Sequence, residues 1–137
     1  MKRIEEQAKR LDQEYQGIAQ LFHQCCQQAG GLAEQYHFFS WPDYEETPPL
    51  CRAFTLLGEP RELRLRCQPG ERGTLIGIIQ ILDDEGKTHA SLGFSADGHL
   101  LLEPGRLLDD PPGLLLKLML GSLWQDQAKG ENERPPH

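Results

Sequence analysis

The sequence predicts an α+β fold, in which an antiparallel β-meander of five or six strands is flanked by a long N-terminal helix and an apolar C-terminal helix. Residues 88–95 alternate apolar side chains with small or polar ones, which is typical of a strand with one buried face. The segments 83–86 and 96–98 each end on glycine, as tight hairpin turns do, because glycine adopts positive φ at little cost. Apolar residues at 4–29 recur at helical spacing, which predicts a helix before the sheet.

The first helix is expected at residues 3–29. Two sets of apolar residues each recur every seven positions, and they interleave as a heptad pattern. These sets are Ile4, Leu11, Ile18 and Cys25, and Ala8, Tyr15, Phe22 and Ala29. Gly30 and Gly31 are expected to end the helix. A helix of this length spans about 40 Å, so it either lies across the sheet or projects from it as a coiled coil toward a partner.

An aromatic segment follows this helix and holds five of the ten aromatic residues in the chain. Its members are Tyr36, Phe38, Phe39, Trp41 and Tyr44. A short strand is expected at 35–40. Aromatic side chains are enriched at interaction surfaces because they bury a large area with few rotatable bonds. The segment therefore either packs between helix and sheet or binds a partner, and it is our preferred recognition surface.

The meander is expected to contain strands at 50–57, 61–67 and 75–82 before the alternating strand at 88–95. The run at 75–82 is apolar on both faces except for one glutamine, as expected of a central strand. If the glycine-ended turn at 96–98 is a three-residue loop, Phe94 faces Leu100 across the hairpin, and the next pair, Leu92 and Leu102, lies on the same apolar surface.

The register of the first hairpin is the least certain feature of the expected sheet. Pairing the strands about Glu59 sets Cys51 opposite Cys67 on one face and Arg52 opposite Arg66 on the other. A shift by one residue would undo both pairs, because side chains alternate between the two faces. The two cysteines are expected to be small core residues.

An excess of arginine marks the same strands. Arg52, Arg64 and Arg66 are the residues expected to bind an anion if they share one face of the sheet. Guanidinium groups suit carboxylate or phosphate partners. The simpler interpretation is that these side chains are solvated beside neighbouring glutamates, and both interpretations stay open.

A second helix is expected after Asp110, a suitable N-cap, with Pro111 and Pro112 in its first turn. Its apolar side chains point almost all round the axis, so we expect burial on more than one side. One sheet covers only one side, and the second side is expected to be covered by the first helix, by the aromatic segment or by another subunit. We predict a homodimer. The expected dimer interface is Leu114, Leu116, Leu120 and Trp124. Residues 1–126 are expected to form a single domain, and the polar residues 127–137 a disordered tail.

The composition excludes several classes of function. A net charge of −7 argues against binding nucleic acid or an anionic membrane surface. Four cysteines are too few for a disulfide scaffold, and the first eleven residues are too charged for a signal peptide, so we expect a cytoplasmic protein with reduced thiols.

Catalytic and metal-binding patterns are weak. No motif for a nucleophilic serine, a bound phosphate, a zinc ion or a dinucleotide occurs in the sequence. His23, Cys25 and Cys26 come nearest to a metal cluster, but adjacent residues on a helix point about 100° apart. We therefore expect no metal and no cofactor. The polar residues His89, Ser91, Ser95 and His99 are expected to be a solvated strand face.

These features together predict a small acidic protein-interaction module, adaptor or chaperone-like, that is homodimeric and non-catalytic. The hairpin at 96–98 followed by a leucine-rich helix resembles the element order of acidic secretion chaperones. Residues 83–86 join two strands directly where those chaperones place a helix. The alternative is a small-ligand-binding protein or enzyme, with a sheet-lined pocket covered by residues 36–44.

Overall fold

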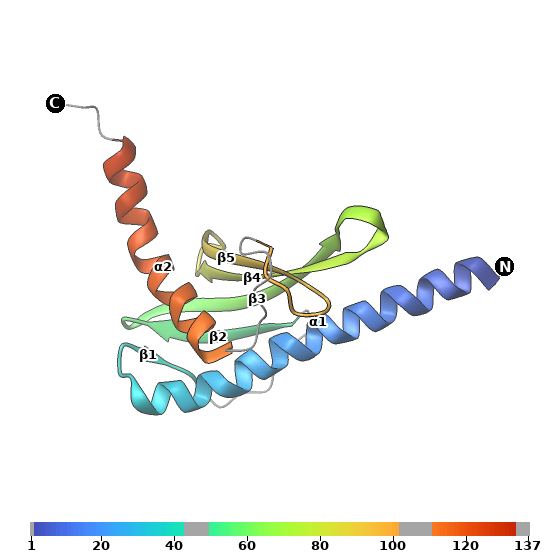
Figure 1. Cartoon of the computed structure of the whole chain (residues 1–137). Helices are drawn as coiled ribbons and strands as arrows, with labels where there is room; N and C mark the ends of the chain where they lie inside the picture. Colours follow the sequence, from blue (N-terminus) through green and yellow to red (C-terminus); the bar gives the residue numbers. More distant parts are fainter. Residues whose placement is uncertain (1, 43–49, 102–110, 134–137) are drawn as a thin grey trace.

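A computed structural model describes residues 2–42, 50–101 and 111–133. Helix α1 (Lys2–Gln35) precedes one antiparallel sheet whose five strands pair in chain order, and helix α2 (Pro111–Glu133) follows it (Figure 1). The strands are β1 (Phe39–Ser40), β2 (Cys51–Leu56), β3 (Glu59–Pro69), β4 (Leu75–Asp83) and β5 (Thr88–Ser95), with a 3-10 helix at Glu71–Gly73. The predicted α+β fold with an antiparallel meander is therefore confirmed.

Both helices pack on the same face of the sheet and contact each other. Ile18 and Phe22 of α1, Met119 of α2 and Phe94 of β5 are fully buried in the core between these layers. α1 approaches the sheet closely at Gly77 of β4. A Cβ atom at Gly77 would stand 2.6 Å from Ile18 Cγ2 and 2.8 Å from Phe94 Cζ. Only glycine leaves room for this contact.

Helix α1 is longer than the sequence predicts. It runs through Gly30 and Gly31 to Gln35, so the expected end at the two glycines is wrong. Ala29 and Leu32 on either side of the pair are both buried in the core. Their packing outweighs the cost of two glycines in a helix, which is about 1 kcal/mol each.

The register of the β2–β3 hairpin also differs from the expected one. The loop is two residues long, Leu57 and Gly58, with φ angles of 51° and 80°, so both residues are in the left-handed region. Cys51 is paired with Arg64, and Arg52 is paired with Leu63. The expected pairs of Cys51 with Cys67 and Arg52 with Arg66 are wrong. Leucine rarely adopts positive φ, and the sequence therefore pointed to a later turn.

The rest of the meander follows the prediction closely. β4 and β5 pair from Ile76 with Ser95 to Leu82 with Thr88, and a β-bulge follows Ile81. Phe94 forms an antiparallel bridge with Leu100, which confirms the expected contact across that hairpin. The expected contact with Leu102 lies outside the described residues.

Helix α2 begins as the sequence predicts, with two prolines in its first turn. The expected cap, Asp110, lies outside the described residues. α2 extends to Glu133. The domain boundary expected at residue 126 is not tested by this helix and stays a prediction.

Candidate functional site

The N-terminal third of α1 extends past the sheet, and residues 2–13 are all exposed (Figure 1). Ile4, Leu11 and Tyr15 are 62%, 52% and 45% exposed. We call these three residues the projecting stripe. Ile18 and Phe22 continue the same heptad pattern and are fully buried against the sheet. One end of the heptad pattern is thus buried against the sheet, and the other end is exposed to water.

A cleft of about 520 Å³ lies beside the projecting stripe, between α1 and β3. Its lining residues come from α1, from β3 and from the residue immediately before β2. They are Tyr15, Leu50, Arg64, Leu65, Arg66 and Cys67. Burial of Cys67 raises the pKa of its thiol, so the thiol is a poor nucleophile. The cleft combines an apolar interior with two cationic side chains.

The three arginines expected to bind an anion do not share one face of the sheet. Arg64 and Arg66 lie on the face away from the helices, whereas Arg52 lies on the helix-covered face. Arg64 Nε and Nη2 stand 3.0 and 2.9 Å from Glu62 Oε1. Arg66 is exposed and forms no ion pair with any described residue. Only Arg64 and Arg66 are therefore placed together at the cleft.

Arg52 is held inside the protein by the aromatic segment. Its guanidinium carbon lies 5.2 Å from the centre of the Trp41 ring, a cation–π contact. Arg52 Nη2 donates a hydrogen bond to the Pro42 carbonyl. Trp41 also packs on Phe54, with ring centres 5.3 Å apart. Arg52 is 9% exposed, so an outside anion would reach it only if the covering residues moved.

The other described members of the aromatic segment form a short ladder of tilted rings. The ring centres of Tyr36 and Phe38 are 5.9 Å apart, and those of Phe38 and Phe39 are 5.1 Å apart. Phe39 is buried in the core, Phe38 is half-buried and Tyr36 is 41% exposed. Tyr44 lies outside the described residues. The segment is thus partly core and partly surface. One part packs against the core, and the exposed part is accessible to a partner.

The residues expected at a dimer interface also divide into two groups. Leu114 is buried in the core, and Leu116 is half-buried. Leu120 and Trp124 are 43% and 58% exposed. The last three recur every four residues, so they form an apolar stripe along α2 that reaches the core at Leu116 and is exposed at Leu120 and Trp124. We call Leu116, Leu120 and Trp124 the α2 stripe.

Two hairpin turns bring histidine and carboxylate together. At the β4–β5 turn, Asp83 Oδ2 lies 2.8 Å from His89 Nε2, and Asp83 Oδ1 accepts hydrogen bonds from the N–H groups of Glu85 and Lys87 at 2.9 Å. Hydrogen bonds lower the pKa of Asp83 to about 2. The hydrogen bond from the His89 side chain has the largest effect, and that from the Lys87 backbone has the next largest. The carboxylate therefore stays ionised and fixes the turn.

The turn after β5 has a similar arrangement. Asp97 accepts a hydrogen bond from the Ser95 hydroxyl and lies 2.9 Å from His99 Nδ1, and these two groups lower the pKa of Asp97 to about 2. The serine hydroxyl donates its hydrogen bond to the carboxylate, in contrast to a Ser-His-Asp triad, in which the hydroxyl is bonded to the histidine. His89 and His99 stand beside different turns, and each lies next to an aspartate of its own turn.

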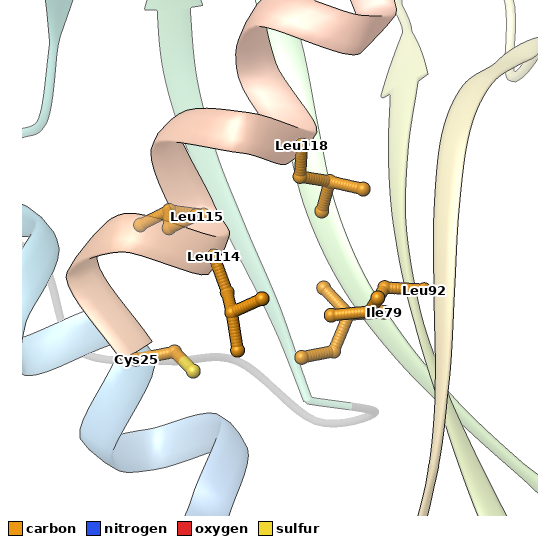
Figure 2. A pocket seen from close by; sticks show the side chains of 6 residues that line it. All are labelled: Cys25, Ile79, Leu92, Leu114, Leu115 and Leu118. Atoms are coloured by element: carbon orange, nitrogen blue, oxygen red, sulfur yellow. The ribbon is translucent and has the colours of Figure 1, made fainter. Parts of the chain in front are cut away.

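A small enclosed cavity lies between the two helices and the sheet (Figure 2). Its lining is entirely apolar, formed by Cys25, Ile79, Leu92, Leu114, Leu115 and Leu118. Its free space of about 10 Å³ is about that of one water molecule. Burial raises the pKa of the Cys25 thiol to about 11, so the thiol is protonated and unreactive at neutral pH. Neither this cavity nor the cleft is lined by the described part of the aromatic segment.

Among the described residues, no three His, Cys, Asp or Glu side chains are grouped to hold a metal ion. None of the helices in the described ranges has the length and apolar character required to span a bilayer.

The cleft beside β3 was not predicted from the sequence. Its location depends on the two-residue turn at Leu57, which fixes how far β2 extends along β3. The signal that could have revealed it is the pair Pro48 and Pro49 before Leu50, because proline cannot donate a backbone hydrogen bond and so limits a strand.

Comparisons with protein-family models, with curated proteins and with solved structures gave no match to this chain.

Proposed function

We propose that this protein is a non-catalytic protein-recognition module, a homodimeric adaptor or chaperone-like protein of the cytoplasm, and that the projecting stripe on α1 binds its partner. The observation that supports this most is the continuity of the heptad pattern. Ile18 and Phe22 are fully buried where α1 meets the sheet, and Leu11 and Ile4 repeat the same spacing where it does not. A helix or groove on a partner would bury these residues in the same manner.

The expected contribution of the stripe follows from its area. Burying one leucine side chain contributes about 1.5–3 kcal/mol, and each 1.4 kcal/mol corresponds to about tenfold in affinity. Leu11 is 52% exposed, so burying the exposed part of its side chain contributes about half of this free energy, which corresponds to about three- to tenfold in affinity. Residues 2–13 have no buried side chain to stabilise them, and short helices are marginal in water without packing. A partner would supply that packing.

The aromatic segment supports the proposal as a second contact surface. Tyr36 is exposed and Phe38 half-buried, so their rings are available at the other end of α1. Tyr and Trp side chains are frequent anchors of interfaces. Trp41 is already packed on Phe54 and Arg52, so its part in recognition would be to hold the segment in place.

Substitution of Leu11 tests the proposal. Leu11→Glu removes an exposed apolar side chain and retains a good helix former, so the fold should keep its thermal midpoint while capture of a partner from the native host weakens about tenfold or more. Two variants serve as matched controls. Leu57→Glu removes another exposed leucine, 62% exposed and outside both helices, and Gln13→Glu adds the same charge to α1 about 200° around the axis.

Both controls should capture the partner as the wild type does, which affinity purification with quantitative mass spectrometry would measure. Equal capture by Leu11→Glu and the wild type would contradict the proposed role of the stripe. Equal loss in Leu11→Glu and Gln13→Glu would attribute the effect to charge alone.

The second candidate function is small-ligand binding, with or without catalysis. The 520 Å³ cleft beside Tyr15 supports this alternative, because it has room for a small molecule and carries Arg64 and Arg66 at its wall. Mass spectrometry of the native purified protein separates the two. A stoichiometric small molecule favours the alternative, and a stoichiometric polypeptide favours recognition.

A further inference from the structure

β3 is longer than its neighbour β2, and part of its edge has no strand beside it among the described residues. β2 pairs with β3 only as far as Cys51 with Arg64, and the Leu65 N–H donates to the Leu50 carbonyl at 2.9 Å. β3 then continues to Pro69. Main-chain groups alternate between the two sides of a strand, so Cys67, two residues after Leu65, points its N–H and C=O toward this open edge.

The chain cannot complete the ladder by extending β2. In the observed register, a longer β2 would place Pro48 opposite Cys67. The residue at that position must donate an N–H to the Cys67 carbonyl, and proline has none. Among the described residues, no strand therefore pairs with β3 at Cys67 on this edge, and a strand from another source could do so.

The cleft lies directly against this edge and has a distinct chemistry on each side of the strand. Leu65 and Cys67 face the helix layer, where Tyr15 forms the opposite wall. Arg64 and Arg66 face the other side of the sheet. Arg66 has no acidic partner among the described residues, although the chain carries a net charge of −7. An unpaired cation at an open strand edge is complementary to a carboxylate.

We propose that this cleft binds an acidic peptide segment of a partner protein in extended conformation, added to the edge of β3 as a further antiparallel strand. Main-chain hydrogen bonds to Cys67 would supply affinity, and the alternating side chains would supply specificity. The peptide residue opposite Cys67 would turn an apolar side chain toward Tyr15. Its neighbour opposite Arg66 would turn a carboxylate toward the guanidinium group. The ligand is thus a segment of alternating apolar and acidic residues.

This inference rests on the proposed recognition function and names the chemistry of the partner. The test uses fluorescein-labelled octapeptides of alternating valine and glutamate, and of alternating valine and lysine, with the full-length protein. Fluorescence anisotropy should show binding of the glutamate peptide, although the protein is itself acidic, and binding of the lysine peptide about tenfold or more weaker. N-methylation of alternate residues, which removes N–H donors and keeps the side chains, should abolish binding.

Variants locate the site. Arg66→Glu should weaken the glutamate peptide about tenfold or more, and Arg66→Gln should weaken it less. Lys87→Glu makes the same change of charge at the β4–β5 turn, on an exposed side chain at the opposite end of the sheet. It should leave binding within about twofold of the wild type. Circular dichroism should show that all three variants are folded.

Several results would overturn the proposal. Equal binding of the two peptides would remove the role of charge, and unchanged binding by Arg66→Glu would place the peptide elsewhere. Equal loss in Arg66→Glu and Lys87→Glu would reduce the effect to overall charge.

A dimer that Arg66→Glu converts to monomer would assign the edge to a second copy of this chain. Failure of peptide binding while Leu11→Glu still impairs partner capture would refute the cleft alone. Peptide binding combined with normal capture by Leu11→Glu would refute the projecting stripe alone.

Discussion

Gly77 decides how closely α1 lies on the sheet. A methyl group at this position would meet Ile18 and Phe94, which are both fully buried. Ile18 is the first buried member of the heptad pattern, directly after the projecting stripe. This close contact therefore lies where the side chains of α1 change from exposed to buried.

Replacing this glycine gives a test at the residue scale. Gly77→Ala should lower the free energy of unfolding by about 1–3 kcal/mol, because an added methyl group in a packed core forces its neighbours apart. Gly121→Ala is the matched control, since a Cβ atom there meets nothing within 4 Å on α2. It should raise the free energy of unfolding by about 0.5–1 kcal/mol through helix propensity. Urea denaturation measures both, and a Gly77→Ala protein as stable as wild type would show that the contact with Ile18 is loose.

Single residues also explain which parts of the candidate site the sequence could predict. The heptad pattern predicted Ile4, Leu11 and Tyr15 as one apolar stripe, because periodicity is a local property. The grouping of Arg52 with Arg66 failed because it depended on a turn whose first residue, Leu57, adopts a φ angle of 51°. A side chain's face in a sheet follows from register, and leucine gave no signal for that turn.

At the scale of elements, α2 is amphipathic in a way that its sequence obscured. Leu114, Leu115, Leu118 and Met119 are buried against α1 and the sheet. In the α2 stripe, Leu116 packs at the edge of the core, whereas Leu120 and Trp124 are 43% and 58% exposed. The sequence correctly predicted that this helix has more apolar surface than one sheet can cover. It could not assign each leucine to a side, because nearly every direction around the axis is apolar.

The α2 stripe carries the prediction of a homodimer. Light scattering at micromolar concentration should give twice the chain mass for the wild type, and the chain mass for the double variant Leu120→Glu with Trp124→Glu. The charged side chains would be buried without partners in the dimer, which is strongly unfavourable. Leu101→Glu replaces a leucine of similar exposure, 45%, outside both helices, and should remain dimeric. A wild-type monomer would contradict this prediction.

At the scale of the whole molecule, the fold fixes a compact helix-on-sheet body and leaves α1 extending past it (Figure 1). Local patterns predicted the α+β class, the order of the strands and the two flanking helices, because alternation and helical spacing are legible in short segments. The open edge of β3 and the cleft beside it depend on the relative lengths of paired strands. Such lengths follow from tertiary packing and register, which no short segment encodes.

The central claim is that the exposed N-terminal part of α1 is a partner-binding surface, and hydrogen exchange tests it most directly. In the isolated protein, the amides of residues 2–13 should exchange faster than those of residues 18–32, which include the buried face of the helix. In the complex with the captured partner, exchange at residues 2–13 should slow about tenfold or more, because the helix would then be packed. Unchanged exchange at residues 2–13 in the presence of a bound partner would contradict the claim.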